Sequence, residues 1–470
     1  MRNTIVFLLF LVAVPRPAAG QESITERVDK VFAPFDRKDS PGCAVGVYRD
    51  GKIAYARGYG MADLQAGVPI TAGTVFDIGS TSKQFTAASI LLLAQRGALS
   101  LDDDVRRHVP ELPEYQKPIT IRHLIHHTSG LRDYIGLLTL AGANTEGHTT
   151  AKQALDAIVR QKALNFEPGS EFLYSNSGYF LLSQIVERAS GKSMRAFAEE
   201  NIFAPLGMRS THFHDDHKMP IPKRAIGYSP DSAGFRVNMS NWEQTGDGAV
   251  NTTIEDLLLW DRNFYEPSVG GHALLKELLT QGTLNNASTL PYARGLMVGS
   301  FRGLTSVSHG GSWAGYRAEL LRFPEQRFAV ATLCNLASAN PSARARAVAA
   351  IYLEDKLAPA PPATQPGSLI SSPVPPPAPT VEAPTGDALK AYEGTYFSEE
   401  LNTTFRLGLE NGVLTIFREG GRTARLRALA NHSFTNGDLT IRFTPGAALN
   451  TGFELNIGRV RGLKFVRTGG

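Results

Sequence analysis

A segment rich in proline and alanine, residues 358–385, divides the chain into two parts. Proline fixes the backbone and lacks an N–H donor, and a run of Pro, Ala and Ser offers too little apolar surface to build a core. Such a segment is expected to be an extended, semi-rigid spacer. The chain of 470 residues is also too long for one core of ordinary size. We therefore predict a linker at 358–385 that joins a domain at 21–357 to a smaller domain at 386–470.

The larger domain has strand patterns near its ends and helical patterns in its middle. Runs of apolar and β-branched residues, one pair of them separated by Asp50-Gly51, predict strands at 44–48, 53–55, 317–323 and 327–334. Helical periodicity predicts helices at 80–95, 120–127, 150–163, 177–189 and 341–355. This order favours an α+β domain in which an antiparallel sheet is flanked by helices and carries an additional all-helical lobe.

The smaller domain has only strand signals. Asn411-Gly412 separates two strand-like runs, which is typical of a hairpin. The expected strands are 404–409, 413–417, 439–443, 452–457 and 462–466. Their short, regular spacing predicts a small all-β barrel or sandwich.

Residues 1–20 have the pattern of a secretory signal peptide. Arg2 gives a positive start, residues 4–14 form an apolar stretch too short to span a bilayer, and small residues at 18–20 supply a cleavage site. An uncleaved anchor is the alternative. No other segment is long and apolar enough to cross a membrane. We therefore expect a periplasmic or secreted protein.

Charge and cysteine content restrict the partners. The net charge is +4, two of the positive charges (Arg2 and Arg16) lie in the leader, and no cationic run stands out. Nothing here favours nucleic acid or an anionic membrane as a partner, and the oligomeric state stays open. Cys43 and Cys334 are the only cysteines. We interpret them as buried free thiols, because the sequence cannot show that they meet, although an exported protein could oxidise them.

The sequence Ser80-Thr81-Ser82-Lys83 carries the sharpest chemical signal. If Ser80 opens a helix, Lys83 lies about one turn later on the same face. An alcohol needs a nearby base to become a nucleophile, and a lysine serves as one only if burial or a helix N-terminus lowers its pKa. By itself the motif is weak, because a helix start followed by a surface lysine gives the same four letters.

Two further short motifs acquire meaning only beside the first. Tyr174-Ser175-Asn176 supplies a phenol that can relay a proton and an amide that can hold a substrate or orient the lysine. His309-Gly310-Gly311-Ser312 precedes a predicted strand, and its glycines would let a ligand approach the backbone. There the histidine could donate a hydrogen bond or positive charge to a substrate. A capped turn and a glycine turn with an exposed histidine are the structural alternatives.

In this order, the three motifs resemble those of the serine β-lactamase and penicillin-binding-protein superfamily. The second motif reads Y-x-N, as in the class C β-lactamase-like branch with its D-stereospecific peptidases and carboxylesterases. Supporting resemblances occur at 76–79, 121–131 and 252–257, and the resemblance covers roughly 24–357. The C-terminal part is similar, more weakly, to lipocalin-like domains appended to some members.

The resemblance implies a role for each matching residue. Ser80 would be the nucleophile, Lys83 and Tyr174 would share base and acid duties, and Asn176 would contact the substrate. The backbone N–H groups of Ser80 and Ser312 would form an oxyanion hole, and the segment from His309 through Gly310 and Gly311 would line the substrate. His309 stands where classical β-lactamases carry the lysine of K-T-G. A neutral imidazole would hold a substrate carboxylate less strongly, which speaks against efficient β-lactam hydrolysis.

These observations predict an exported serine hydrolase that acts through an acyl-enzyme on amides or esters, with D-amino-acid peptides or small esters as the expected substrates. A class C-type β-lactamase is one alternative, and a sensor or ligand-binding protein that is acylated without turnover is another. No metal or organic cofactor is implied. The group His212, His214, Asp215, Asp216 and His217 matches no standard zinc spacing, so we interpret it as a solvated loop.

Overall fold

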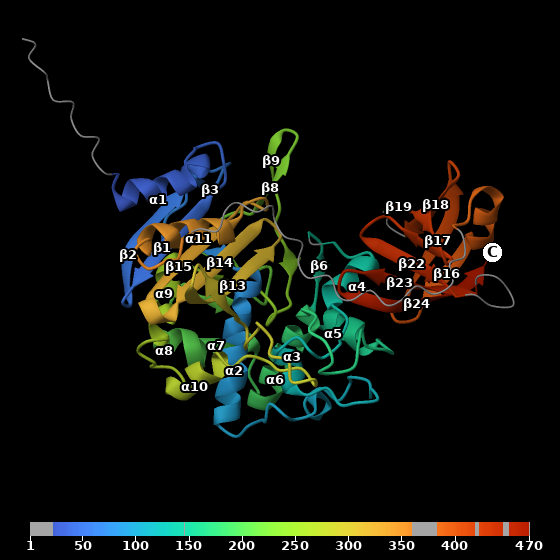
Figure 1. The fold of residues 1–470 in the computed structure, drawn as a ribbon, viewed down its shortest axis with the longest axis horizontal. Coiled ribbons are helices and arrows are strands. Elements are labelled where there is room, and N and C mark those ends of the chain that lie inside the picture. The colour runs from blue at the N-terminus through green and yellow to red at the C-terminus, as the bar shows by residue number, and fades with distance from the viewer. Residues whose placement is uncertain (1–21, 145, 360–382, 419–422, 445–450, 470) are drawn as a thin grey trace, which may run out of the picture.

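A six-stranded antiparallel sheet forms the centre of the first domain in the computed structural model (Figure 1). The structure describes residues 22–144, 146–359, 383–418, 423–444 and 451–469. The predicted leader and most of the predicted linker therefore lie outside the described residues. In spatial order the strands are β12 (Met297–Phe301), β13 (Leu304–Trp313), β14 (Tyr316–Phe323), β15 (Phe328–Cys334), β1 (Cys43–Arg49) and β2 (Lys52–Tyr59).

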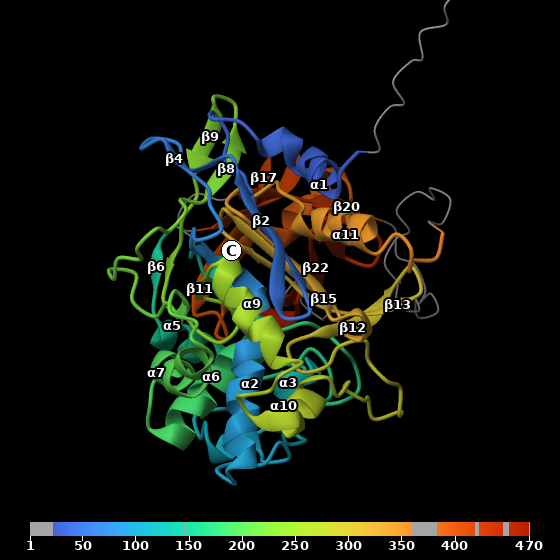
Figure 2. The same ribbon diagram turned by 90° about the vertical axis from the view of Figure 1, so that its left-hand side faces the viewer.

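Both faces of this sheet are covered by helices, as Figures 1 and 2 show. Helices α1 (Ile24–Phe32) and α11 (Pro341–Tyr352) pack on one face, and α9 (Ile254–Asn263) packs on the other. Strand β1 reads as an almost continuous apolar run because alternate side chains enter two different cores. Val45 and Val47 join the core under α1 and α11, whereas Ala44 and Tyr48 join the core that continues into the helical lobe.

The helical lobe surrounds helix α2 (Lys83–Gln95), whose first eleven residues are all buried. A short 3₁₀ turn, η2 (Gly79–Ser82), precedes α2, so the predicted helix at 80–95 begins as a 3₁₀ turn. Helix α6 (Asn176–Ser190) packs directly against α2. The other helices here are α3 (Ile121–Ile125), α4 (Tyr134–Leu140), α5 (Ala151–Val159), α7 (Met194–Ala198), α8 (Ala204–Leu206) and α10 (Gly271–Leu278).

Short strands form further pairs outside the six-stranded sheet. They pair as β3 with β4, β8 with β9, β6 with β10, and β5 with β11 and β7. Their bounds are β3 (Met61–Asp63), β4 (Val68–Pro69), β5 (Phe76–Asp77), β6 (His148–Thr149), β7 (His212–Phe213), β8 (Tyr228–Asp231), β9 (Gly234–Val237), β10 (Asn241–Trp242) and β11 (Val250–Thr252).

The C-terminal domain is a nearly closed antiparallel barrel of nine strands, preceded by the 3₁₀ segment η6 (Gly386–Tyr392). The predicted all-β class and the strands at 439–443 and 452–457 are confirmed. In spatial order the strands are β19 (Thr423–Arg425), β18 (Val413–Arg418), β17 (Thr403–Glu410), β16 (Gly394–Ser398), β24 (Val460–Gly469), β23 (Gly452–Ile457), β22 (Leu439–Phe443), β21 (Ser433–Thr435) and β20 (Arg427–Leu429). Its interior is lined by aromatic rings such as Tyr396, Phe443 and Phe453.

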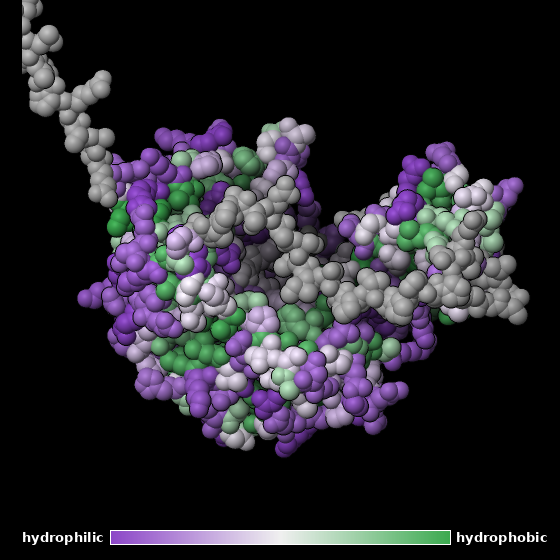
Figure 3. Space-filling model, viewed as in Figure 1, coloured by the Kyte–Doolittle hydropathy of each residue, from purple (hydrophilic) through white to green (hydrophobic). Residues whose placement is uncertain are grey.

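The barrel docks against the helical lobe (Figure 1), and the surface is hollowed between it and the β8–β9 hairpin (Figure 3). Arg132 of the first domain is buried and bonds to Glu400 at 2.7 Å and to the backbone oxygens of Arg461 and Gly462. Glu400 also accepts a hydrogen bond from the backbone N–H of Lys162 at 2.7 Å. A buried charge is tolerated only where it is paired, so these bonds define a specific interface.

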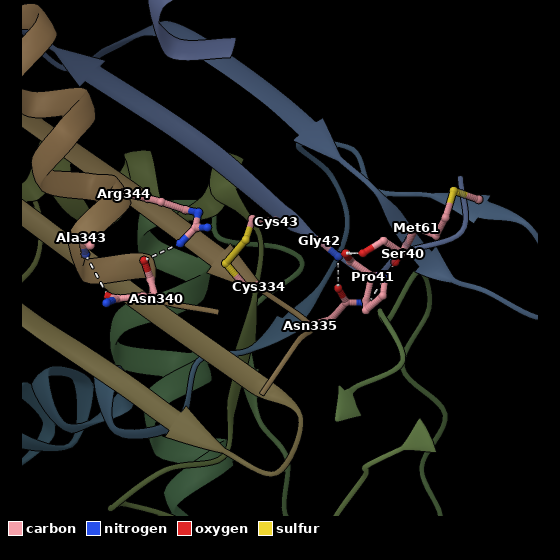
Figure 4. Close-up of a disulfide and its surroundings, with 10 residues drawn as sticks. All are labelled: Ser40, Pro41, Gly42, Cys43, Met61, Cys334, Asn335, Asn340, Ala343 and Arg344. Carbon is pink, nitrogen blue, oxygen red and sulfur yellow. Dashed lines mark hydrogen bonds between the residues drawn. A yellow bond between two sulfur atoms is a disulfide. The ribbon is translucent and has the colours of Figure 1, made fainter. Parts of the chain in front are cut away.

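Cys43 and Cys334 form a disulfide, which corrects the expectation of two free thiols (Figure 4). They are paired residues on the adjacent strands β1 and β15, with a Cα–Cα distance of 4.0 Å. The sequence could not show this because 291 positions separate them. Only the pairing of an early strand with a late one makes them neighbours. Among the described residues, no helix has the length and apolar character needed to cross a membrane.

Candidate active site

Ser80 lies in the 3₁₀ turn η2 that leads into α2, in contact with strand β13. Gly79 has a left-handed φ of +49°, and a Cβ atom built on it would lie 2.7 Å from the backbone nitrogen of Ser312. Only glycine fits there, because the chain bends and β13 approaches closely. The bend places Ser80 and Ser312 together on the wall of one pocket. That arrangement fits the expected oxyanion hole, which stays a prediction.

Lys83 is fully buried one turn after Ser80, and its amino group reaches the serine. The Nζ atom donates hydrogen bonds to the Ser80 hydroxyl at 3.2 Å, to the Asn176 side-chain oxygen at 3.0 Å and to the Asp247 backbone oxygen at 2.5 Å. Burial lowers the pKa of Lys83 to about 7, and the negative charges of Asp247 and Asp133 oppose that change. A lysine with such a pKa can accept a proton from a serine near neutral pH.

Tyr174 comes from the segment before α6, and its ring lies 4.9 Å from Lys83 Nζ. Its hydroxyl is buried and makes no hydrogen bond of good geometry to any residue in the described ranges. Burial raises the pKa of this phenol, whereas the neighbouring Ser80 hydroxyl lowers it. The tyrosine is therefore protonated before reaction, with a hydroxyl next to the serine that has no competing partner. It can relay a proton rather than act as a resident phenolate.

Asn176 is the first residue of α6 and connects the lysine to an acidic residue. Its backbone N–H and its side-chain amide both donate to one oxygen of Asp133, at 2.9 and 3.0 Å. Its side-chain oxygen then faces Lys83. Asp133 thus fixes the orientation of the amide, which in turn aims the lysine at Ser80.

His309 lies within β13, not before a strand as expected, and it is buried. Its Nε2 lies 3.2 Å from the hydroxyl of Tyr292 and its Nδ1 lies 2.6 Å from the backbone oxygen of Gly310. Burial lowers the pKa of His309 to about 3, helped by the charge of Lys83, so the ring is neutral. A neutral ring carries no positive charge to offer a substrate, and the expected contact of His309 with the substrate stays a prediction. Gly311 allows β13 to approach, because an added Cβ would lie 1.8 Å from the backbone oxygen of Ile78.

A pocket opens beside the nucleophile. Its walls come from η2, β13, the start of α6 and the β10–β11 region. Side chains that line it include those of Ser80, Asn176, Ser312, Asp247, Arg224, His214, Trp242 and Trp313. In Figure 2, α2 and α6 lie side by side in the lower part of the molecule. Apolar rings and a few polar groups around a reactive side chain are typical of a small-molecule or peptide site.

The structure unites residues that the motifs predicted with others that they missed. Ser80, Lys83, Tyr174 and Asn176 form one cluster, and Ser312 lines the same pocket beside the Ser80 turn. Asp133 stands outside the three motifs and joins the cluster by accepting hydrogen bonds from Asn176. Asp247 and Arg459 carried no sequence signal, because neither stands in a motif and each reaches the site through tertiary packing.

The histidines expected in a solvated loop do not behave as one group. His212 lies in β7 and His214 is buried with ring nitrogens that have no described partner. His217 instead lies beside His148 and Glu243, and these three side chains could hold a metal ion. The proximity of His148 could not be seen in the sequence.

The model of the Beta-lactamase family matches residues 28–354 of this chain, so the chain belongs to this family. The chain is 31% identical to a D-aminopeptidase of Gluconobacter oxydans over 67% of its own length and 59% of that protein. It is 34% identical to Penicillin-binding protein 4* of Bacillus subtilis, over 61% of this chain and 66% of that one. The chain thus spans about three fifths to two thirds of the length of these curated relatives.

Solved structures show that the fold extends beyond the family region. An octameric penicillin-binding protein homologue from Pyrococcus abyssi is similar with a TM-score of 0.62 and 24% identity, covering 94% of this chain and 99% of that one. A D-stereospecific amidohydrolase from a Streptomyces species is similar with a TM-score of 0.57 and 21% identity, over 70% of this chain and 98% of that one. At these identities the similarity shows the fold alone.

Proposed function

We propose that this protein is an exported serine hydrolase that forms an acyl-enzyme on Ser80 and cleaves amide or ester bonds, with D-amino-acid peptides or small esters as substrates. One observation carries the proposal: the buried Lys83 amino group lies 3.2 Å from the Ser80 hydroxyl while Asn176 and the Asp247 backbone hold it in place. The curated relatives named D-aminopeptidase support amides of D-amino acids as the substrate class.

The first half of the reaction follows from these positions. Neutral Lys83, with Tyr174 as a relay, takes the Ser80 proton as Oγ attacks the substrate carbonyl carbon. The carbonyl oxygen becomes an oxyanion, which the backbone N–H groups of Ser80 and Ser312 stabilise. The C–N or C–O bond then breaks, and the leaving group takes the proton from the Tyr174 hydroxyl, which Lys83 resupplies. Ser80 is left as an ester of the acyl group.

The second half returns the enzyme to its starting state. A water molecule loses a proton to the same lysine and tyrosine pair and attacks the Ser80 ester. The C–Oγ bond breaks and the proton returns to Oγ, which releases a carboxylic acid. Burial of Lys83 suits both halves, because a pKa of about 7 lets its amine take and give a proton near neutral pH, while the raised pKa of Tyr174 keeps the phenol protonated between transfers.

Two observations support the finer parts of the proposal. The Cys43–Cys334 disulfide fits an oxidising compartment and therefore export. His309 is neutral and bonded on both sides, so β13 lacks the cation that would favour a β-lactam carboxylate. A β-lactamase activity is accordingly expected to be weak.

Turnover separates a hydrolase from an acylated sensor. The mature protein would be incubated with a chromogenic ester, a D-alanyl peptide and a chromogenic cephalosporin, with Ser80→Ala as the matched control. We expect multiple turnovers on the ester and the D-peptide that disappear in Ser80→Ala. A burst that stops after one equivalent would overturn the hydrolase in favour of a sensor.

A further inference from the structure

Arg459 brings a positive charge from the barrel to the candidate active site. It lies in the turn between β23 and β24, and this turn is fixed to the helical lobe by its backbone. The backbone oxygen of Arg459 accepts a hydrogen bond from the Asn165 side chain at 3.0 Å, and the backbone N–H of Arg461 donates to the same side chain at 2.8 Å. The turn is therefore held in place independently of what the Arg459 side chain does.

The Arg459 guanidinium lies over Tyr174, 4.6 Å from the ring centroid. Its one side-chain hydrogen bond within the described ranges is a long one, 3.5 Å to an Asp133 oxygen that already accepts two bonds from Asn176. The side chain remains 44% exposed. A guanidinium has five N–H donors in a planar fork that matches a carboxylate, so most of its donors are available.

Other cations near Ser80 are less suited to an anionic ligand. Lys83 must be neutral to act as the base, and His309 is neutral with both ring nitrogens bonded. Arg224 lines the pocket, but its charge acts on the Asp77 carboxyl and its guanidinium lies 5.8 Å from the centroid of the Tyr316 ring. Among the described residues, the Arg459 guanidinium has the shared Asp133 oxygen as its only charged partner.

We propose that Arg459 binds a carboxylate of the substrate and so makes the barrel part of the active site. This inference rests on the proposed hydrolase function and specifies its substrate: acyl donors that carry a free carboxylate near the scissile bond. The β13 strand then supplies the backbone that lines the substrate, while the appended domain supplies the charge.

Paired substrates test this directly. kcat/KM would be measured for a D-peptide with a free C-terminal carboxylate, for the same peptide as its C-terminal amide, and for a neutral ester. Arg459→Gln is expected to lose at least tenfold on the acid while the amide and the ester change less than threefold, and Arg459→Lys should recover part of the loss. Arg461→Gln is the matched control, because Arg461 lies on the same hairpin but pairs with Glu171 at 3.0 Å.

Three results would overturn the inference. The first is an equal loss on all three substrates, which would mean that Arg459 acts through Lys83 and Tyr174. The second is an unchanged acid-to-amide ratio in Arg459→Gln. The third is loss of the preference in Arg224→Gln instead. Hydrolysis of the neutral ester tests the hydrolase function without a carboxylate. If the ester is cleaved, any of these three results contradicts the role of Arg459 and leaves the hydrolase function standing.

A second and independent observation concerns His148, His217 and Glu243. One potential ligand atom from each lies within 4.8 Å of the others. His217 Nδ1 lies 2.7 Å and His148 Nε2 lies 3.2 Å from the two oxygens of the same Glu243 carboxylate. Tetrahedral zinc bound by nitrogen and oxygen at its usual bond lengths separates neighbouring ligand atoms by about 3.3 Å. The side chains need little movement to enclose an ion.

We infer a site here for a divalent transition-metal ion such as Zn²⁺, with two imidazoles, one carboxylate and an open position towards solvent. The site would fasten the loop that carries His217 to the paired strands β6 and β10. Trp242 and Gln244, which flank Glu243, line the pocket beside Ser80. A bound ion would therefore stiffen one wall of that pocket.

Metal titration tests this second inference. Tag-free, chelator-treated protein would be titrated with Zn²⁺ by calorimetry and with Co²⁺ by visible absorption. One ion per chain is expected, with affinity at least about tenfold weaker in His148→Ala, His217→Ala and Glu243→Gln. His272→Ala, an exposed histidine of α10, is the control and should bind as the native protein does. The site would be overturned if the His148→Ala and His217→Ala variants bound the ion as tightly as the native protein, or if no saturable binding were seen.

Discussion

The guanidinium of Arg132 and the carboxylate of Glu400 lie 2.7 Å apart, and both are buried although they belong to different domains. Glu400 precedes β17 in the barrel, and Arg132 directly precedes Asp133, which holds Asn176. The pair therefore links the barrel to the residues that orient Lys83. The appended domain therefore contacts residues that directly adjoin the candidate active site.

The buried pair makes a prediction about stability. Arg132→Met removes the cationic partner and leaves the buried Glu400 carboxylate with hydrogen-bond donors such as the Lys162 backbone N–H. Loss of one member of such a pair costs about 3–5 kcal/mol. Thermal unfolding should show a lower midpoint, and limited proteolysis should release the barrel sooner. Arg461→Gln, which removes only an exposed ion pair, should change the free energy of unfolding by less than about 1 kcal/mol. Equal effects of the two variants would contradict the interface as described.

The pH dependence of acylation should report Lys83. The base must be neutral, so kcat/KM on an uncharged ester is expected to rise as pH increases through about 7, the pKa to which burial lowers Lys83. The negative charge of Asp247 raises the Lys83 pKa. Asp247→Asn should therefore move the acidic limb to lower pH. If the acidic limb of the kcat/KM profile stays at the same pH in Asp247→Asn, Lys83 is excluded as the base. A limb near the ordinary pKa of lysine in the native protein would exclude it as well.

Tyr174→Phe should separate activity from stability. The hydroxyl has no hydrogen-bond partner of good geometry in the described part of the chain, so its removal leaves no partner unsatisfied. The melting temperature should stay the same or rise slightly. Loss of the proton relay should lower kcat by roughly 10²- to 10⁴-fold. A variant that melts early but retains its rate would show that Tyr174 is structural.

Removing the disulfide should affect stability and leave the chemistry intact. A Cys43→Ala, Cys334→Ala double variant should be less stable by about 2–5 kcal/mol, because the bond closes a long loop between β1 and β15. Both residues belong to the core under α1 and α11, whereas the site lies in the other core. Denaturant titration would measure the loss in the free energy of unfolding. The value of kcat, measured at denaturant concentrations below the unfolding transition, would show whether the chemistry is intact. A fall in kcat at full folding would show coupling between the two cores.

Much of the site was accessible from the sequence because its chemistry is concentrated in short motifs. Ser80 and Lys83 are one helical turn apart, so local geometry alone places them together. Tyr174 lies just before a helix with a clear apolar pattern, and Asn176 is the first residue of that helix. The barrel was also foreseeable, since alternating residues around Asn411-Gly412 favour hairpins.

Residues that reach the site through tertiary packing were not accessible in this way. Asp247 and Arg459 lie in turns with no periodicity, and their roles depend on which elements pack beside them. The environment of His309 also depends on packing. The glycines that follow it, Gly310 and Gly311, suggest a turn, whereas the pairing of β13 with β14 makes His309 a buried strand residue. Cys43 and Cys334 meet only because β1 pairs with β15.

Intact-mass spectrometry with a fluorophosphonate probe, followed by peptide mapping, tests the central assignment most directly. The native protein is expected to gain one adduct, located on Ser80, and Ser80→Ala should gain none. Lys83→Met should react much more slowly, because Ser80 would keep its proton. An adduct on another residue, or equal labelling of Ser80→Ala, would contradict the account.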